Sequence, residues 1–373
     1  MNYGMDIAIT GIGVVSPVGL SAPATCSALR AGIARMGEIQ TYGVDGEFFD
    51  KKPVIGGRVP TEWFEGEPVP EEWPGHERFQ VPSPPPREAM VVSGVDRLIE
   101  LAVPAACEAW QSTVQIDDTS GVMGLYIGLD DFDESTTVVA AITEAIGRTP
   151  EIVVEERVGR AASLTVLHRS IQDLLTGRVT IALVGGVDSL IRAEVLERLD
   201  EAEILRSDSR PQGVIPGEAA AFVVIEHIQS AKNRGVPIRG YLLSTAVAEE
   251  PTADTEDPNQ GIGLTRALRA ARQGAGNFET PLLIVCDLNG DRYRGLEWSL
   301  ASIRVLGNLH GKIDIWHPAD CIGDSGAGSG ILSIIWAVTA LQKKYAKTER
   351  VLVWGASAGK ARAAAVVACA DLT

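Results

Sequence analysis

Short apolar runs alternate with segments of helical periodicity along most of the chain. In the segment 158–186, Leu164, Leu167, Ile171 and Leu174 recur at helical spacing, Gly177 ends the helix, and an apolar run follows at 179–184. Comparable units recur from residue 6 to residue 370. This alternation predicts an α/β protein with a mostly parallel sheet.

The pattern assigns the individual elements as follows. Helices are expected at 21–34, 95–110 (kinked at Pro104), 136–147, 160–177, 262–273, 297–306 and 322–344. Buried strands are expected at 6–15, 121–130, 179–184, 217–228, 239–248, 281–290 and 312–318, and the last, at 350–370, can bend back as a hairpin.

The chain also carries weak internal symmetry. A small-residue helix start, a buried helix and a strand ending in glycine occur at 159–186 and again at 326–357. Two such units indicate duplicated βαβ halves, placed at 1–235 and 236–373 within one compact unit.

One region departs from this pattern. Nine of the chain's 20 prolines lie between Pro53 and Pro86. We expect residues 37–88 to form an irregular insertion with one short strand at 54–60. The region is expected to pack as a surface lobe on the fold or on a partner; the alternative is a polyproline ligand.

Charge and cysteine content narrow the function. The formal net charge of −16 argues against nucleic acid and anionic membranes as partners. Five scattered cysteines without a CxxC pair indicate a reducing compartment and no structural zinc. The start lacks the features of a signal peptide and no apolar run is long enough to span a membrane, so we expect a cytoplasmic protein without a cofactor.

An acidic loop is the one candidate cation site. It comprises Asp130, Asp131, Asp133 and Glu134. Such a run more often caps the following helix and is solvated, so no metal is expected; a cation site is the alternative.

Several motifs, taken in order, resemble the β-ketoacyl synthases of the thiolase superfamily. The motifs are "IAITGIGVVSPVG", "DRLIELAVPAACEAW", "LLTGRVTIALVGGVDSLI", "GVIPGEAAAFVVIE", "IGDSGAGSG" and "VWGASAG". The resemblance runs from about residue 6 to residue 368 and implies a thiolase fold, in which the two halves form a five-layered α-β-α-β-α arrangement.

The catalytic residues of that family are replaced in this chain. The family uses a cysteine at a helix N-terminus and two histidines. The resemblance places Arg160 at the nucleophile's position, Asn289 at the first histidine and Asp324 at the second, while Ala319 replaces the lysine that usually precedes it. No catalytic residue is therefore expected, because arginine is neither nucleophile nor base at neutral pH.

We expect Arg160 and Asp324 to form an ion pair across the former active site, with Asn289 completing the hydrogen bonds. An arginine at a helix N-terminus is unfavourable by about 0.3–1 kcal/mol unless a carboxylate meets it. The alternative is that Arg160 points to solvent and Asp324 caps its helix. If Arg160 fills the cavity, the cavity should be too small and too charged for an acyl chain.

Other residues are weaker candidates. Cys321 and His317 could form a relocated dyad near the same cavity but are expected to pack beside a strand end. His168 and the remaining cysteines are interpreted as structural. The resemblance implies a buried structural carboxylate at Glu218, and glycines at the pocket at Gly355 and Gly359.

Two functional classes follow. The first is a non-enzymatic relative that binds a protein: either a partner subunit of an active synthase, or an adaptor similar to the thiolase-like proteins of bacterial type VI secretion effector clusters. The second is an acyl-thioester enzyme using relocated residues. The resemblance also implies a homodimer or a heterodimer with a related subunit, and an effector or an acyl carrier protein as a further partner.

Overall fold

The computed structural model describes residues 6–39, 54–60, 94–113, 121–130, 135–276, 282–309 and 313–370. Most of the Pro-rich insertion and Asp131, Asp133 and Glu134 of the acidic loop lie outside these ranges. Of the insertion, two short antiparallel strands are described, β2 (Gly37–Ile39) and β3 (Val54–Gly56), and β3 overlaps the strand expected at 54–60.

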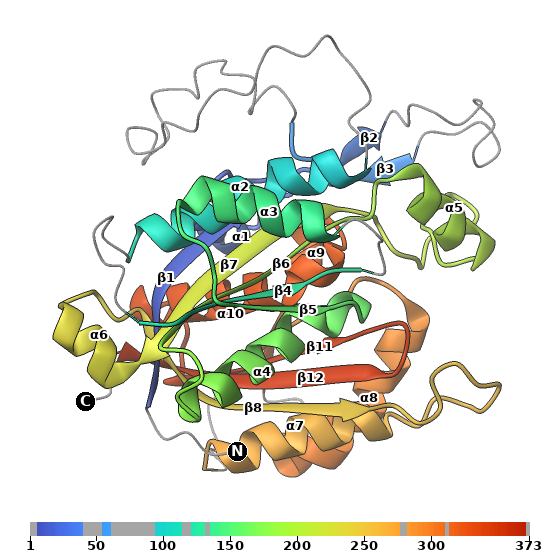
Figure 1. Ribbon diagram of the computed structural model, residues 1–373. Helices are drawn as coiled ribbons and strands as arrows, with labels where there is room; N and C mark the ends of the chain where they lie inside the picture. Colours follow the sequence, from blue (N-terminus) through green and yellow to red (C-terminus); the bar gives the residue numbers. More distant parts are fainter. Residues whose placement is uncertain are drawn as a thin grey trace, which may run out of the picture.

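The remaining described strands form one ten-stranded sheet built from two equivalent sets of five (Figure 1). The first set contains β1 (Ile7–Val15), β4 (Met123–Gly128), β5 (Ile152–Glu156), β6 (Ile181–Ser189) and β7 (Glu218–His227). The second contains β8 (Gly240–Glu249), β9 (Leu282–Cys286), β10 (Ile313–Trp316), β11 (Arg350–Ala356) and β12 (Ala361–Cys369).

The two sets share one topology, which confirms the duplicated architecture. The order is β5-β4-β6-β7-β1 in the first half and β10-β9-β11-β12-β8 in the second. In each half the first two pairings are parallel and the last two antiparallel. The expectation of a mostly parallel sheet was therefore wrong, because strands such as β11 and β12 are joined by a hairpin, which reverses direction.

Helices divide the molecule into five layers. The outer face of the first half carries α2 (Gly94–Gln111) and α3 (Ser135–Ile146), and that of the second half carries α7 (Ile262–Gly274) and α8 (Arg292–Leu306). Between the two five-stranded halves of the sheet lie α4 (Ala162–Leu175) and α10 (Ser329–Gln342) (Figure 1). The short pairing of β1 with β8 at residues 7–9 and 240–242 joins the halves.

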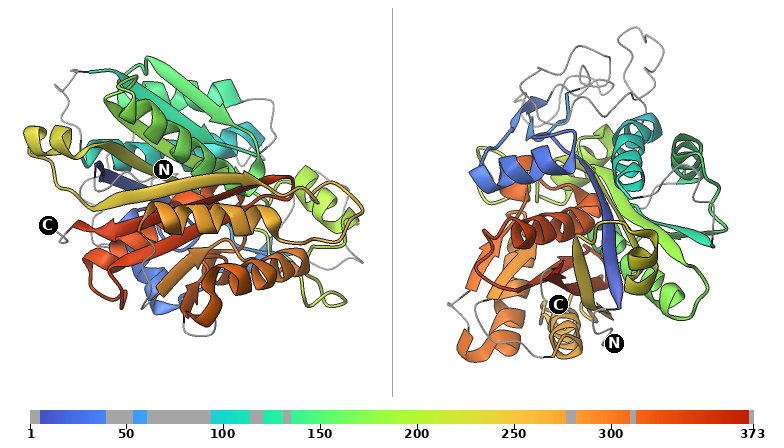
Figure 2. Two further views of the ribbon diagram at one scale, coloured as in Figure 1. Left: turned by 90° about the horizontal axis from the view of Figure 1, so that it is seen from below. Right: turned by 90° about the vertical axis from the view of Figure 1, so that its left-hand side faces the viewer.

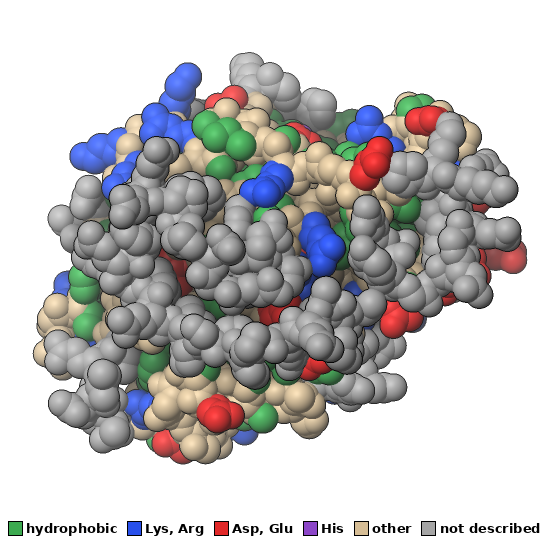
Figure 3. Space-filling view, turned by 90° about the horizontal axis from the view of Figure 1, so that it is seen from above, with side chains coloured by type: hydrophobic (Ala, Val, Ile, Leu, Met, Phe, Trp, Pro, Cys, Tyr) green, Lys and Arg blue, Asp and Glu red, His purple; other side chains and the backbone are tan. Residues whose placement is uncertain are grey.

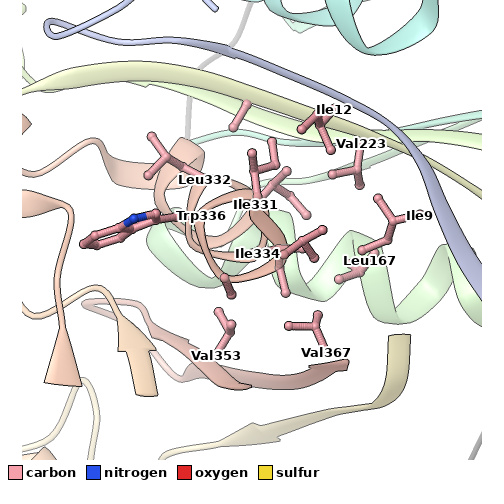
Figure 4. Close-up of a cluster of buried hydrophobic side chains, with 14 of the residues drawn as sticks. Ile9, Ile12, Leu167, Val223, Ile331, Leu332, Ile334, Trp336, Val353 and Val367 are labelled. Atoms are coloured by element: carbon pink, nitrogen blue, oxygen red, sulfur yellow. The ribbon is translucent and has the colours of Figure 1, made fainter. Parts of the chain in front are cut away.

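The central helix α10 accounts for this layering. It is apolar on all sides and almost wholly buried, as expected of a helix that packs on both halves of the sheet at once. Figure 4 shows Ile331 and Ile334 between Ile9, Ile12 and Val223 on one side and Val353 and Val367 on the other.

Smaller helices complete the fold: α1 (Ala22–Ala31), α5 (Ala193–Glu201), α6 (Ile228–Arg234) and α9 (Ala319–Ile322). The sequence pattern placed the end of α1 at residue 34, but Gly32 at φ 67° turns the chain and donates to Ala28 O, ending the helix earlier. It missed β5, α5 and α6. The strand β5 is short, half-buried and ends in two glutamates, so it lacks the apolar run of a central strand.

Candidate functional site

Arg160 lies in a single 3₁₀ turn, Gly159–Ala161, immediately before α4. Gly159 adopts φ +71°, which lets the chain turn into the helix. The hydroxyl of Ser357, in the β11–β12 turn, accepts from Ala161 N at 3.0 Å and donates to Val158 O. The second half of the molecule thus fixes the turn that carries Arg160.

Asp324 lies opposite, in the segment between α9 and the start of α10. Its backbone N–H donates to Ile215 O at 2.8 Å, and its carbonyl accepts from Gly217 N at 2.9 Å. These bonds tie the segment to the loop that enters β7, so the backbone of Asp324 is held on both sides.

The predicted ion pair is present. Arg160 Nε and Nη2 lie 2.6 and 2.5 Å from Asp324 Oδ2, and the two side chains are 12% and 2% exposed. Asn289, just after β9, donates to the same oxygen at 2.5 Å, and Gly326 N donates to Oδ1 at 3.0 Å. The alternative of a solvent-facing Arg160 is excluded by this geometry.

The pair is stabilised in its charged form. Burial alone would lower the pKa of Arg160, but the negative charge of Asp324 outweighs it and raises the pKa above its usual value. For Asp324, burial would raise the pKa of the carboxyl, but the Arg160 guanidinium outweighs it and holds the pKa below its usual range. Neither group is arranged to exchange a proton near neutral pH.

Sequence reasoning missed three further charged residues beside this pair. Asp287 Oδ2 accepts from Arg294 Nη1 and from Ala356 N, both at 2.9 Å, and its charge also raises the pKa of Arg160. Asp188, at the end of β6, accepts from Ala327 N at 3.1 Å. The sequence could have indicated the two aspartates, because Asp287 and Asp188 each stand at the end of an apolar run that forms a buried strand.

Burial raises the pKa of Asp188 to about 6, with the nearby Asp130 contributing, while Arg192 opposes the shift. Asp130, from the candidate cation loop, pairs with Arg198 at 2.9 Å. Within the described ranges no group of three or more His, Cys, Asp or Glu side chains is placed to hold a metal ion.

Glu218 is a separate, structural anchor. It is fully buried, and its carboxylate accepts from Arg97 Nη2 at 2.5 Å, Ser189 Oγ at 2.7 Å and Val59 N at 2.8 Å. The prediction of a buried carboxylate at this position is confirmed. Its contacts connect β7 to α2, β6 and the strand region after β3.

The candidate Cys321–His317 dyad is not assembled. His317 Nδ1 contacts Asp320 Oδ2 at 2.7 Å, and no described hydrogen bond joins it to Cys321. Cys321 is buried, and burial together with the charge of Asp320 raises the pKa of its thiol. Cys26 and Cys286 are also buried with raised thiol pKa values, about 12 for Cys26. These environments oppose thiolate formation.

His168 makes structural contacts, as expected. Its ring lies 2.8 Å from Thr245 Oγ1 and 3.1 Å from Gln172 Nε2. Gly355 packs close to the Arg160 backbone, and Gly359 lines the pocket described next.

A pocket of about 980 Å³ opens beside Arg160. Its wall combines the apolar side chains of Leu190, Val195 and Leu199 with the charged residues Asp188 and Arg362. Arg160 contacts Asp324 and is also one of the residues that line this pocket. Such a volume is within the range of small-molecule sites.

No described helix is long and apolar enough to cross a membrane.

Part of the chain resembles a known protein family. Residues 159–231 match the model of the β-ketoacyl synthase N-terminal domain. The highly reducing polyketide synthase frbB of Dothideomycetidae sp. (strain 11243) is 22% identical over 207 residues. That alignment covers 50% of this chain but only 8% of the synthase, so the relative is far longer.

Solved structures match over the whole chain. The ishigamide ketosynthase/chain length factor has a TM-score of 0.76 at 19% identity, with 98% of this chain and 99% of that chain covered. The AntDE:AntF complex, a type II polyketide acyl-carrier protein with its ketosynthase, gives 0.78 at 15% identity, with coverage of 98% and 100%. The chain therefore has the thiolase-like fold of the ketosynthases, with Arg160, Asn289 and Asp324 bonded together at its centre.

Proposed function

We propose that this protein is a non-enzymatic member of the ketosynthase fold that serves as a partner subunit for another protein. The observation that carries the proposal is the Arg160–Asp324–Asn289 cluster. The resemblance assigns these three positions to the nucleophile and the two histidines. Arg160 cannot act as a nucleophile, and Asp324, held charged by Arg160, has no hydrogen to donate to an oxyanion.

The surrounding thiols support the proposal. Condensation through a covalent intermediate needs a thiolate, and helix N-termini or nearby cations normally supply it. Cys321, the nearest candidate along the chain, has a raised thiol pKa because of burial and because of the Asp320 carboxylate. The alternative, an acyl-thioester enzyme with relocated residues, would have to use a group of this kind.

The strand β5 is the proposed pairing edge. It lies at one end of the ten-stranded sheet and pairs with β4 on one side. Val153 in this strand is 43% exposed, and Glu156 at its end lines the pocket. A second subunit joined to β5 would cover unpaired backbone groups and border the pocket.

The identity of the partner has two versions. A related ketosynthase-fold subunit is favoured by the similarity to a structure described as a ketosynthase/chain length factor. An adaptor role for a secreted cargo rests on the resemblance to proteins of type VI secretion effector clusters. Neighbouring genes separate the two: a synthase and carrier protein accompany the first version, and secretion machinery the second.

Sedimentation velocity on the full chain, alone and co-expressed with a ketosynthase-fold protein from the same gene neighbourhood, tests the pairing. We expect a dimer in one of the two samples, and its loss in Val153→Lys, because a lysine blunts an edge strand. Leu175→Lys, at an exposed apolar position on α4, is the matched control and should leave the dimer intact. Monomers in both samples, or equal behaviour of the two variants, would contradict the proposal.

A further inference from the structure

The outer helix α8 presents an apolar stripe to solvent. The α8 stripe consists of Tyr293, Leu296, Leu300 and Ile303, whose spacing places them within one quarter of the helix circumference. Leu296 and Ile303 are 51% and 61% exposed and Tyr293 is 37% exposed. Leu300 is half-buried, so Leu296 and Ile303 are the most exposed side chains of the stripe.

Positive charge surrounds this stripe. The helices α7 and α8 contain six arginines, at positions 266, 269, 272, 292, 294 and 304, and one acidic residue, Glu297. Glu297 is buried and paired with Arg362 at 2.7 Å, and Arg294 is buried and paired with Asp287 at 2.9 Å, so neither reaches the surface. Five exposed or half-buried arginines remain on the two helices. A local excess of arginine is unexpected in a chain whose net charge is −16.

The arginines are held next to the α8 stripe. Arg269 Nη2 reaches from α7 to Arg304 O at 3.3 Å, and Arg304 Nη1 donates to Gln260 O. Both side chains therefore bond to backbone carbonyls, and neither forms an ion pair with a carboxylate of the described residues. Arg292 lies beside the stripe at the other end of α8 and is exposed.

The α8 stripe begins at Tyr293, four residues after Asn289 of the candidate site. Figure 2 shows α7 and α8 side by side on the underside of the molecule, the face opposite to α2 and α3. The face above α2 carries both Lys or Arg and Asp or Glu side chains (Figure 3). Acidic residues border the underside in loops, at Asp291 and at Glu256 and Asp257.

We propose that the outer face of α7 and α8 is a docking surface for an acidic amphipathic helix of a partner protein. The alternating spacing of three and four residues in the α8 stripe matches the apolar face of another helix. The flanking arginines then meet glutamates or aspartates on either side of that face, since charge complementarity selects the partner and its orientation. This surface is distinct from the pairing edge at β5.

A designed peptide tests the proposal on the full chain. The probe is a helical peptide of about 18 residues with leucine at positions matching the stripe and glutamate at the flanking positions. A version with lysine in place of every glutamate is the charge control. Binding is followed by fluorescence anisotropy at about 50 mM and about 500 mM NaCl.

We expect the glutamate peptide to bind at least about tenfold more tightly than the lysine peptide, and more weakly at high salt. The double variant Leu296→Ser/Ile303→Ser, and separately Arg266→Glu/Arg292→Glu, should each weaken binding about tenfold or more. Leu175→Ser, at an exposed apolar position on α4, should not change it.

Three results would overturn the proposal: equal binding of the two peptides, no effect of the α8 variants, or a change of self-association in Leu296→Ser/Ile303→Ser without an effect on the peptide. The last would assign the stripe to contact between copies of this chain. Circular dichroism and unfolding midpoints of each variant establish that the fold is retained.

Discussion

Burying the charge of Arg160 or of Asp324 alone would destabilise the fold, whereas the two opposite charges can be buried as a pair. Removing a charge from water costs several kcal/mol, and the short two-atom contact of the guanidinium with Asp324 Oδ2 offsets that cost. The Asn289 side chain and the Gly326 backbone N–H donate further hydrogen bonds to the carboxylate. Both oxygens of the Asp324 carboxylate are therefore occupied by protein donors.

A double-mutant cycle measures this interdependence. Arg160→Met leaves Asp324 buried without its counter-charge and should lower the free energy of unfolding by about 3–5 kcal/mol. Adding Asp324→Asn should restore about 1–3 kcal/mol, which urea denaturation would detect as a favourable coupling. Arg198→Met, which removes an exposed partner of Asp130, is the control and should cost less than about 1 kcal/mol. Additive costs for the first two changes would show that the charges are independent.

Asp188 makes a pH-dependent contribution at the same site. Its pKa in the folded protein, about 6, lies above the ordinary value of 3.8, so the folded state retains a proton that the unfolded state releases. Its contribution is therefore most favourable below pH 4 and is lost as the pH rises from about 4 to about 6. Urea midpoints measured across this range should fall less steeply in Asp188→Asn than in the native protein. Identical slopes would contradict the assignment.

At the scale of elements, close backbone contacts decide where side chains can be tolerated. At Gly186 in β6, an added Cβ would lie 2.4 Å from Ala327 O, the backbone just before α10. This contact holds the sheet of the first half against the segment that carries Asp324. It explains why a glycine stands at this position of β6.

Gly186→Ala should therefore destabilise the protein by about 1–3 kcal/mol or more, because neither backbone segment can move freely. Gly295→Ala, in α8, is the matched change: no atom lies within 4 Å of its Cβ. It should stabilise by about 0.5–1 kcal/mol through helix propensity. Thermal unfolding compares the midpoint temperatures of the two variants. Equal midpoints would indicate that the contact of Gly186 with Ala327 O is not close enough to exclude a Cβ.

The elements with strong apolar patterns were predictable, and those without them were not. Strands β1, β6 and β9 and helices α4, α7 and α10 follow from continuous apolar runs or helical periodicity. The edge strand β5 was missed because half of its surface faces solvent. The direction of β7 against β6 depends on the route of residues 190–217, which no local pattern encodes.

Some residues of the candidate site were predictable from the sequence and others were not. Arg160, Asn289 and Asp324 came from their order relative to glycine-rich motifs, and the structure joins them. Asp287 and Arg294 were missed because their pairing depends on how α8 packs against the end of β9.

At the scale of the whole molecule, the duplicated fold places one strand-to-helix unit from each half against the other. The turn before α4 carries Arg160, and the segment before α10 carries Asp324. Bonds from Ser357 and from Ile215 and Gly217 hold these two segments in place. The ion pair thus links the two halves across the layer formed by α4 and α10.

Intact mass spectrometry of the full chain after incubation with acetyl- and malonyl-thioesters tests the central claim most directly, with malonyl decarboxylation followed in the same tube. We predict an unchanged mass and no decarboxylation above the rate without protein, since the proposed function places Arg160 where a nucleophile would act. A functioning ketosynthase treated identically is the control. An acyl adduct that disappears in Cys321→Ser, or decarboxylation that needs the folded protein, would contradict the account and identify this pocket as a working active site.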